Sequence, residues 1–275
     1  MARPPVSHKP PPKGRPELRS RPDSPPPARP EPKTDKVAGL PAVAALFARD
    51  PKRVESLVFE ARWKEAAQPF CKDLSARHKS FRQVGPEELT RIAGSPMHGG
   101  IVALARPKPV LLFDPLDAKG WAEARQPLLL LDGIGNPHNL GAIARTMAFF
   151  GLEHLVISDH PGQAGPSESA MRVAEGGLEW ISLHRTAKFL PALKRLRDSY
   201  RVIGTALGSG RPLAEVLGRP GKPVALILGN EEHGLSPDTL AACDDIATIP
   251  GSGRVQSLNV AATAAILIHA LAAKR

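Results

Sequence analysis

The chain has 275 residues, enough for one large domain or two modest ones, and 42% of them are hydrophobic. Aromatic residues make up only 4% of the chain, so its core must be built mainly from aliphatic side chains. The net charge of +10 favours polyanionic partners, because a Lys or Arg near a phosphate releases bound counterions. A soluble basic protein with no nucleic-acid role is the plainer alternative.

Cysteine usage and hydropathy limit the compartment. Cys71 and Cys243 match neither a disulfide framework nor a metal-ligand spacing, so we expect no metal and a reducing environment. The N-terminus lacks the apolar segment of a signal peptide. The longest apolar stretch, residues 260–273, is too short and too rich in alanine to span a bilayer. A cytoplasmic protein with no membrane contact is therefore expected.

Residues 1–36 differ in composition from the rest of the chain. They hold twelve of the thirty prolines, and their nine Lys or Arg against four Asp or Glu give a net charge of +5 (9 − 4). Such a segment cannot bury enough apolar surface to offset its conformational entropy, so we predict a disordered arm. The arm either strengthens RNA binding or only solubilises the protein, and both interpretations stay open.

A small α/β domain is predicted over residues 37–105. Helical patterns and strand patterns alternate along it. The expected helices cover residues 39–47, 62–77 and 86–92, and the expected strands cover residues 54–59 and 99–105. Residues 106–126 contain three prolines and are expected to be a linker with a short helix around Trp121.

From residue 127 onward the pattern is typical of a parallel α/β domain. Short, continuous apolar runs indicate strands that are covered on both faces, and longer amphipathic segments separate them. The expected strands cover residues 128–131, 155–158, 180–183, 201–206 and 223–228, and the expected helices cover residues 139–150, 168–173, 186–199 and 257–273. Ligands of such sheets bind beyond the carboxyl ends of the strands, where three loops are chemically unusual.

The first loop, residues 132–141, leads into a helix. Asn139 can cap this helix, and Gly141 permits a close approach at its start. Arg145 follows Asn139 by six residues, a little under two turns, so the two side chains can face roughly the same side. Amides and a guanidinium at a helix start suit a phosphate or a ribose. A capped helix with a solvated Arg is the plainer alternative.

The second loop, residues 229–236, follows a continuous apolar strand. Gly229 can let a ligand approach the backbone at the strand end. Glu231 is placed to orient a guanidinium or a ligand hydroxyl. Alternatively, the loop is only an acidic turn before a helix that starts near Ser236.

The third loop, residues 249–259, is rich in glycine and opens onto an alanine-rich helix. Its backbone N–H groups can hold the polar atoms of a cofactor. Ser257 lies at or near the helix start, where a simple N-cap is the plainer role. Asn259 is harder to explain in that way, because Asn has a poor helix propensity.

Together the three loops resemble the signature motifs of the SpoU (TrmH-like) RNA methyltransferases, over residues 127–275. The patterns are N-x-x-N-x-G-x-x-x-R, L-G-N-E-x-x-G and I-P-x-x-G-x-x-x-S-L-N-V-A, in the family's order. The resemblance implies methyl transfer from S-adenosylmethionine to a ribose 2′-hydroxyl of tRNA or rRNA. It also implies a deep trefoil knot and a homodimer built around that knot. Residues 95–103 are similar to the closing strand of the family's small, ribosomal-protein-like substrate-binding domain.

The resemblance also assigns site residues. The motif residues that it implies for catalysis are Arg145, Asn139, Glu231, Ser257 and Asn259. The cofactor positions that it implies are Thr205, Ala206, Leu207, Gly229, Ile249 and Leu258. A guanidinium is a poor base, so we expect Arg145 to clamp a phosphate or ribose, held in place by Glu231 and Asn139.

Two other functions stay open from the sequence. One is a non-catalytic RNA-binding or ribosome-assembly protein that retains the knotted fold, although the intact motif residues argue against it. The other is a base-nitrogen methyltransferase of the same superfamily. The S-L-N motif and the spacing of Asn139 and Arg145 favour ribose over a base nitrogen.

Overall fold

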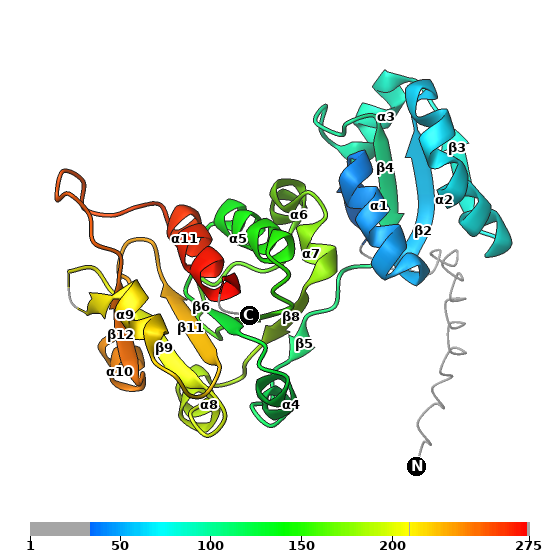
Figure 1. The fold of residues 1–275 in the computed structure, drawn as a ribbon. Helices are drawn as coiled ribbons and strands as arrows, with labels where there is room; N and C mark the ends of the chain where they lie inside the picture. Colours follow the sequence, from blue (N-terminus) through cyan, green and yellow to red (C-terminus); the bar gives the residue numbers. More distant parts are fainter. Residues whose placement is uncertain (1–33, 209, 274–275) are drawn as a thin grey trace, which may run out of the picture. The chain divides into compact units, whose positions relative to one another are not determined.

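The computed structural model describes residues 34–208 and 210–273 (Figure 1). The arm predicted over residues 1–36 lies outside these residues except at its last three positions. At Asp35 and Lys36 the prediction is wrong, because both residues already belong to β1 (Asp35–Ala38). Its polar residues are ordered by antiparallel pairing with the strand that ends at Ala105.

The N-terminal part forms its own four-stranded sheet in the order β1-β4-β2-β3. Its other strands are β2 (Val54–Phe59), β3 (Ser80–Gln83) and β4 (Ile101–Ala105). The helices are α1 (Leu40–Arg49), α2 (Lys64–Ala76) and α3 (Pro86–Ala93), with 3-10 turns at Pro51–Arg53 and Ala61–Trp63. The sequence missed β3 because all four of its residues are exposed and leave no alternating pattern.

The C-terminal part is built on an eight-stranded sheet in the order β10-β12-β9-β11-β6-β7-β8-β5, in which every pairing is parallel. Its strands are β5 (Leu111–Leu112), β6 (Leu128–Asp132), β7 (His154–Ile157), β8 (Ser182–Arg185), β9 (Arg201–Thr205), β10 (Arg211–Pro212), β11 (Val224–Gly229) and β12 (Asp245–Thr248). Its helices are α4 (Asp117–Glu123), α5 (Pro137–Phe149), α6 (Glu168–Ala174), α7 (Gly177–Trp180), α8 (Phe189–Leu196), α9 (Leu213–Gly218), α10 (Pro237–Ala241) and α11 (Val260–Ala272).

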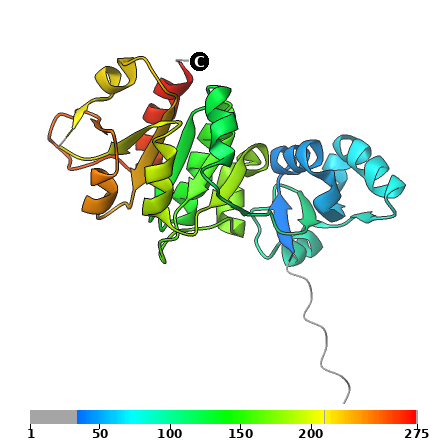
Figure 2. The same ribbon diagram turned by 90° about the horizontal axis from the view of Figure 1, so that it is seen from below.

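Helices cover both faces of this sheet (Figures 1 and 2). Leu129 and Leu131 of β6 join the core cluster that contains residues of α5, α6 and α11. Leu128 and Leu130 point to the opposite face and join the cluster with residues of α4 and α8. Burial on both faces explains why β6 is a continuous apolar run.

The predicted strand over residues 180–183 begins later than expected. Trp180 belongs to the short helix α7, and β8 runs from Ser182. Strand β12 was missed because its polar residues, Asp245 and Thr248, give no continuous apolar run. Among residues 34–208 and 210–273, no helix combines the length and the apolar character needed to cross a membrane.

A buried ion pair lies where the N-terminal sheet's elements meet α7. The Arg53 guanidinium donates to the Glu179 carboxylate across 2.7 Å, and their side chains are only 5% and 3% exposed. Arg53 Nε also donates to the carbonyl of Arg106 at 2.9 Å. Asp35 lies 3.7 Å from the Arg53 guanidinium and Lys108 Nζ lies 3.9 Å from the Glu179 carboxylate, so the pair is the centre of a small charge network. Since both central charges are removed from water, they depend on this network for compensation.

Candidate active site

The loops after β6 and β11 lie side by side because these two strands are neighbours in the sheet. From β6 the chain adds β7 and β8 on one side, whereas β11 lies on the other side, next to β9. The sheet order therefore changes direction at β6. In open α/β sheets such a switch point is where ligands bind, beyond the carboxyl ends of the strands.

Asn139 does not cap helix α5, contrary to the prediction. The helix begins at Pro137, and Asn136 is the N-cap, whose side chain accepts from the backbone of His138 at 2.9 Å. Pro suits the first helical position because its fixed φ matches the helix and its missing N–H is not needed there. Asn139 is thus free of a capping role and is buried, with 8% of its surface exposed.

The freed Asn139 side chain joins all three loops. Its Nδ2 donates to Glu231 Oε1 at 2.8 Å. Its Oδ1 accepts from Asn259 Nδ2 at 3.3 Å. Residues from the first, second and third loops therefore meet at one point, although they are 92 and 120 positions apart in the chain.

Glu231 is held as an anion. Burial by itself would raise the pKa of this carboxyl, but hydrogen bonds from Asn139 and from backbone amides outweigh it and lower the pKa. The backbone N–H groups of Gly135 and Asn136 contact its two oxygens at 3.3 and 3.4 Å. Hydrogen bonds to the charged form favour ionisation, so Glu231 accepts hydrogen bonds and links the first two loops.

Glu231 does not hold Arg145, so this part of the prediction is wrong. The Arg145 guanidinium pairs with Glu175 instead, across 2.9 Å. The oxygens of Glu231 are already occupied by Asn139 and the loop amides. Arg145 lies almost two turns further along α5, beside the segment that connects α6 and α7.

Two motif glycines are explained by packing within the protein. A Cβ on Gly229 would lie 2.4 Å from the carbonyl carbon of Gly234, because the turn after β11 folds back on the strand end. A Cβ on Gly141 would lie 2.4 Å from the carbonyl oxygen of Ala170 in α6. The close approach expected at Gly141 is therefore to a neighbouring helix, and Gly229 needs no ligand to account for it.

Ser257 is not the cap of the last helix. Helix α11 begins at Val260, and the Asn259 side chain caps it by accepting from Ala261 N at 2.8 Å. Capping explains why Asn stands at a position that is poor for a helix interior. Ser257 is exposed in the preceding loop. Helix α10 begins at Pro237, close to the start expected near Ser236, and the Ser236 side chain caps it by accepting from Thr239 N at 3.1 Å.

The third loop leaves its backbone donors open. Within the described residues, the only backbone N–H of residues 250–258 that donates a hydrogen bond is that of Arg254, to Ser252 Oγ at 3.4 Å. Leu258 is 48% exposed, and Leu207, after β9, is 63% exposed. Ile249 is partly buried against the core. These positions offer unpaired N–H donors beside apolar side chains.

Two other expected cofactor positions are tied to the sheet. Thr205 Oγ1 donates to the carbonyl of Ile227 at 3.0 Å, and Ala206 N donates to the carbonyl of Ala247 at 3.1 Å. These bonds hold the end of β9 against β11 and β12. Thr205 and Ala206 therefore fix the position of Leu207 rather than offering free donors.

Sequence reasoning missed residues that shape the loops from within. Asn230 donates from Nδ2 to the carbonyl of Gly133 at 2.8 Å, which ties the second loop to the first. Gln163 is buried and bonds both the N–H and the carbonyl of Ile134. The turn-forming tendency of Asn was a usable signal for Asn230. No periodicity marks Gln163.

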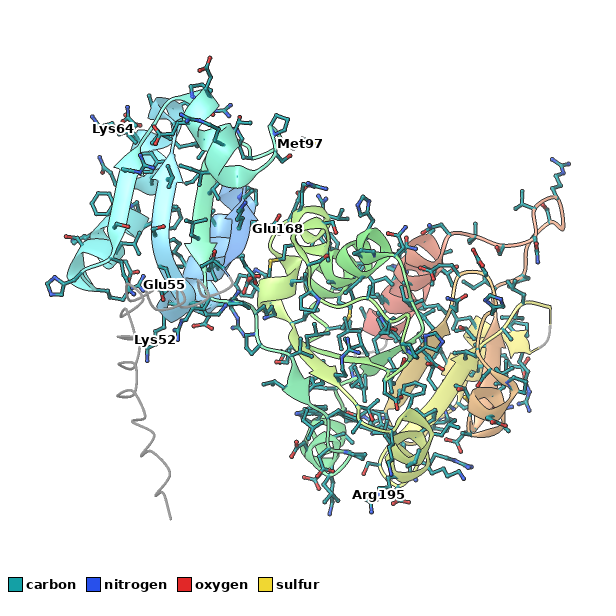
Figure 3. All side chains as sticks on the ribbon, turned by 180° about the vertical axis from the view of Figure 1, so that it is seen from behind. Lys52, Glu55, Lys64, Met97, Glu168 and Arg195 are labelled. Atoms are coloured by element: carbon teal, nitrogen blue, oxygen red, sulfur yellow. The ribbon has the colours of Figure 1, made fainter. Side chains whose placement is uncertain are left out.

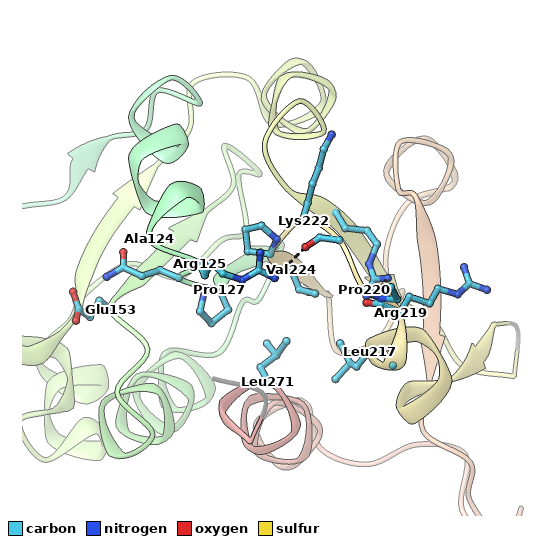
Figure 4. A pocket seen from close by; sticks show the side chains of 15 residues that line it. Ala124, Arg125, Pro127, Glu153, Leu217, Arg219, Pro220, Lys222, Val224 and Leu271 are labelled. Carbon is cyan, nitrogen blue, oxygen red and sulfur yellow. Dashed lines mark hydrogen bonds between the residues drawn. The ribbon is translucent and has the colours of Figure 1, made fainter.

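A cavity of about 550 Å³ lies elsewhere, near the amino ends of β9 and β11 (Figure 4). Arg125, Arg201 and Leu271 are among the residues that line it, and none of the expected site residues does. The Arg125 guanidinium closes part of it by donating to the carbonyl of Gly221 at 3.0 Å. The joined loops lie at the opposite, carboxyl ends of the strands.

A parallel α/β sheet whose carboxyl-edge loops are joined by Asn139, Glu231 and Asn259 is the arrangement expected of a SpoU-type methyltransferase. Residues 126–269 match the SpoU rRNA Methylase family. Residues 36–111 match the RNA 2'-O ribose methyltransferase substrate binding family. The chain belongs to the SpoU rRNA methylase family.

The chain also matches curated proteins over nearly the whole length of those proteins. The chain is 31% identical over 234 residues to the 23S rRNA (guanosine-2'-O-)-methyltransferase RlmB of Acinetobacter baylyi, covering 84% of this chain and 94% of the relative. It is also 31% identical over 241 residues to the RlmB of Ralstonia nicotianae, covering 86% and 94%.

Solved structures share the fold. A putative RNA methyltransferase of the TrmH family from Porphyromonas gingivalis superposes with a TM-score of 0.67 at 26% identity, covering 88% of this chain and 90% of that one. An AdoMet-bound rRNA methyltransferase from Sinorhizobium meliloti superposes with a TM-score of 0.71 at 21% identity, covering 88% and 87%.

The protein is therefore an RNA ribose-2′-O methyltransferase of a family that uses S-adenosylmethionine. The third loop fits this cofactor, because open backbone donors beside exposed leucines can hold both the polar and the apolar parts of a nucleoside. When bound, S-adenosylmethionine supplies an electrophilic methyl group on a positively charged sulfur.

Proposed function

We propose that the protein methylates the ribose of a guanosine in 23S rRNA. The observation that carries this proposal is the network in which Asn139 joins Glu231 and Asn259. The proposal is supported by two relatives of 31% identity, both 23S rRNA (guanosine-2'-O-)-methyltransferases. The match covers 94% of the length of each relative. A tRNA substrate is the alternative.

The cofactor is proposed to bind on the third loop. Leu207 and Leu258 present exposed apolar side chains, and the backbone beside Ile249 and Leu258 supplies donors. Gly229 at the end of β11, and Thr205 and Ala206 at the end of β9, are proposed to complete this site from neighbouring strand ends. Backbone donors held by rigid strand ends orient a ligand at little entropic cost.

Arg145 is proposed to clamp an RNA phosphate near the reacting ribose. Its guanidinium is 55% exposed and offers a planar pair of donors that matches a phosphate. A guanidinium stays protonated in proteins, so Arg145 gains rate through positioning rather than through proton removal. Ser257, exposed within the third loop, supplies a hydroxyl that can accept a hydrogen bond from the ribose.

Asn139, Glu231 and Asn259 are proposed to keep the three loops in register during the reaction. Anionic Glu231 accepts from Asn139 and from the first loop's backbone, and Asn259 adds the start of α11. Loss of one of these links frees the loops by a small distance. Displacements of about 1 Å in such sites can cost on the order of 100-fold in rate.

A second copy of the chain is proposed to cover α5 and α11. These helices pack together, and they leave Phe149 and Ile266 83% and 42% exposed. Phe150 lies against His269 of α11 with ring centroids 5.6 Å apart. An apolar patch on neighbouring helices favours an interface between subunits. We also propose that the chain after β11 forms a trefoil knot, because the resemblance to the SpoU family implies one.

Phe149→Asp tests the dimer. It should shift the mass measured by light scattering from two chains to one at micromolar concentration, while the chain stays folded. Exposed Leu112 lies on β5, away from this patch, and Leu112→Asp is the matched control. If the wild-type protein had the mass of one chain, the dimer proposal would be wrong.

The N-terminal domain is proposed to grip the RNA backbone, with boundaries close to residues 37–105 and a linker over residues 106–126. Its surface carries basic and apolar side chains such as Lys64 and Met97 (Figure 3). His98 is buried and fixes the turn before β4, accepting from Gly100 N at 3.0 Å and contacting Thr90 Oγ1 at 3.0 Å. This rigid turn holds Met97, which is 72% exposed.

A methylation assay tests the substrate. Purified protein, S-adenosylmethionine and either 23S rRNA or total tRNA are incubated, and the RNA is digested to nucleosides for mass spectrometry. We expect 2′-O-methylguanosine from 23S rRNA. Methyl groups on a base would contradict the ribose chemistry, and methylation of tRNA alone would contradict the substrate. No calorimetric binding of S-adenosylmethionine would identify a non-catalytic relative.

A further inference from the structure

The partner of Arg145 stands in a strained backbone position. Glu175 follows α6 with φ 44° and ψ 45°, in the left-handed region. A side chain with a Cβ is disfavoured there, and Gly or Asn is the usual residue at this position after a helix. The glutamate at this position therefore costs conformational stability that glycine would not.

The following two glycines hold Glu175 in this conformation. A Cβ on Gly176 would lie 2.8 Å from Ala45 Cβ in α1, and a Cβ on Gly177 would lie 2.7 Å from Arg145 Cα in α5. The chain after Glu175 is thus packed between two helices. Strained residues persist where the surroundings leave no alternative, and they gather at functional sites.

This packing aims the Glu175 carboxylate at the motif arginine. Glu175 Oε2 lies 2.9 Å from Arg145 Nη2, and the two side chains are 53% and 55% exposed. A carboxylate and a phosphate offer a guanidinium similar pairs of oxygens. Since exposed ion pairs are weak, a phosphate can displace the carboxylate without a large free-energy cost.

We propose that the Glu175 carboxylate occupies the Arg145 guanidinium in the RNA-free protein, competes there with RNA and is displaced by an RNA phosphate. The inference rests on the proposed role of Arg145 as a phosphate clamp. Glu175 therefore adds to the free-energy cost of RNA binding at Arg145, because a phosphate must displace its carboxylate.

The consequence is a split between binding and turnover. Without the carboxylate, RNA no longer competes for Arg145, and the KM for RNA falls. The bound complex is the same in both proteins, because the phosphate has replaced Glu175 there. The kcat is therefore unchanged.

Glu175→Gln and Glu175→Gly test the proposal by steady-state methylation. Both variants should lower the KM for RNA by about two- to fivefold, the range that exposed ion pairs are worth, with kcat within twofold of wild type. Glu175→Gly should also raise the unfolding temperature, because glycine relieves the left-handed strain. If Glu175→Gln folds poorly, Glu175→Gly still provides the test.

Glu168→Gln is the matched control for net charge. Glu168 lies at the other end of α6, is exposed and makes the same change in charge (Figure 3). Its KM for RNA should change by much less than that of Glu175→Gln. An equal fall in KM in both variants would show a general charge effect and overturn the proposal.

The Arg145→Gln background isolates the pair. In that background Glu175→Gln should leave the equilibrium affinity for RNA unchanged, measured by filter binding at fixed salt. A persisting gain in affinity, or a fall in kcat in Glu175→Gln alone, would overturn the displacement mechanism. Failure of the proposed function is separate, since it would appear as a wild-type protein that methylates no RNA.

Discussion

Acidification should destabilise the fold through His154. This histidine, at the start of β7, stacks on Trp121 with ring centroids 3.7 Å apart and planes at 12°. Its Nε2 contacts Gln126 Oε1 at 3.1 Å, whereas its Nδ1 is buried without a hydrogen-bond partner. Burial, with a smaller contribution from nearby His184, lowers the pKa of His154 from 6.5 to about 4. Protonation would leave a buried N–H unpaired.

The sign and size follow from proton linkage. The folded state has the lower pKa, so the unfolded state binds more protons between pH 4 and 6.5. The contribution to stability is therefore complete above about pH 6.5 and is lost as the pH falls toward 4. Between pH 7 and pH 5 the free energy of unfolding should fall by about 2 kcal/mol, an upper value because His154 is partly exposed.

Urea unfolding followed by tryptophan fluorescence at pH 7 and pH 5 measures this loss. His154→Phe keeps an aromatic ring against Trp121 but has no group to protonate. Its pH dependence should shrink without vanishing, because His184, whose pKa burial also lowers, is still present. If the variant lost as much stability on acidification as the wild type, the assignment to His154 would be refuted.

Three further predictions concern stability. Gly229→Ala should lower the free energy of unfolding, measured in urea, by about 1–3 kcal/mol, because its Cβ would clash with the turn after β11. Gly234→Ala, the comparison, meets no atom within 4 Å and should lower it by only about 1–2 kcal/mol, because of the φ of +68° at this position. Glu179→Gln should cost about 3 kcal/mol, because the buried Arg53 then keeps only the more distant Asp35 carboxylate at 3.7 Å, and a thermal scan showing no loss would contradict this. S-adenosylmethionine at about 100 times its Kd should stabilise the protein by about 3 kcal/mol, and Leu258→Asp should abolish this shift.

Sequence patterns predicted the elements that bury whole side chains. The strand over residues 54–59 matches β2 at both ends, and the continuous apolar runs at residues 128–131 and 223–228 became β6 and β11. Elements without such a pattern, such as β3, were missed. Hydrophobic periodicity reports burial, so exposed or very short elements leave no trace in it.

The site was predictable as a set of loops but less so as a set of contacts. The motifs and the strand-end rule indicated that Asn139, Glu231 and Asn259 belong together, and hydrogen bonds join them. The partner of Arg145 was wrong, because Glu175 lies in a segment fixed by helix packing that no local pattern describes. Local rules choose caps and turns, whereas side-chain partners depend on the whole fold.

The position of β6 in the sheet also bears on how the protein folds. Leu129 pairs with Leu155 of β7, close in sequence, and with Leu226 of β11, which lies almost a hundred residues away. Closing so long a loop is entropically costly, and folds rich in distant pairings fold slowly. The first loop can thus be in place on β6 and β7 well before the second loop arrives. Substitutions that weaken the β6–β11 pairing should slow the appearance of methyl transfer during refolding more than the recovery of helical signal.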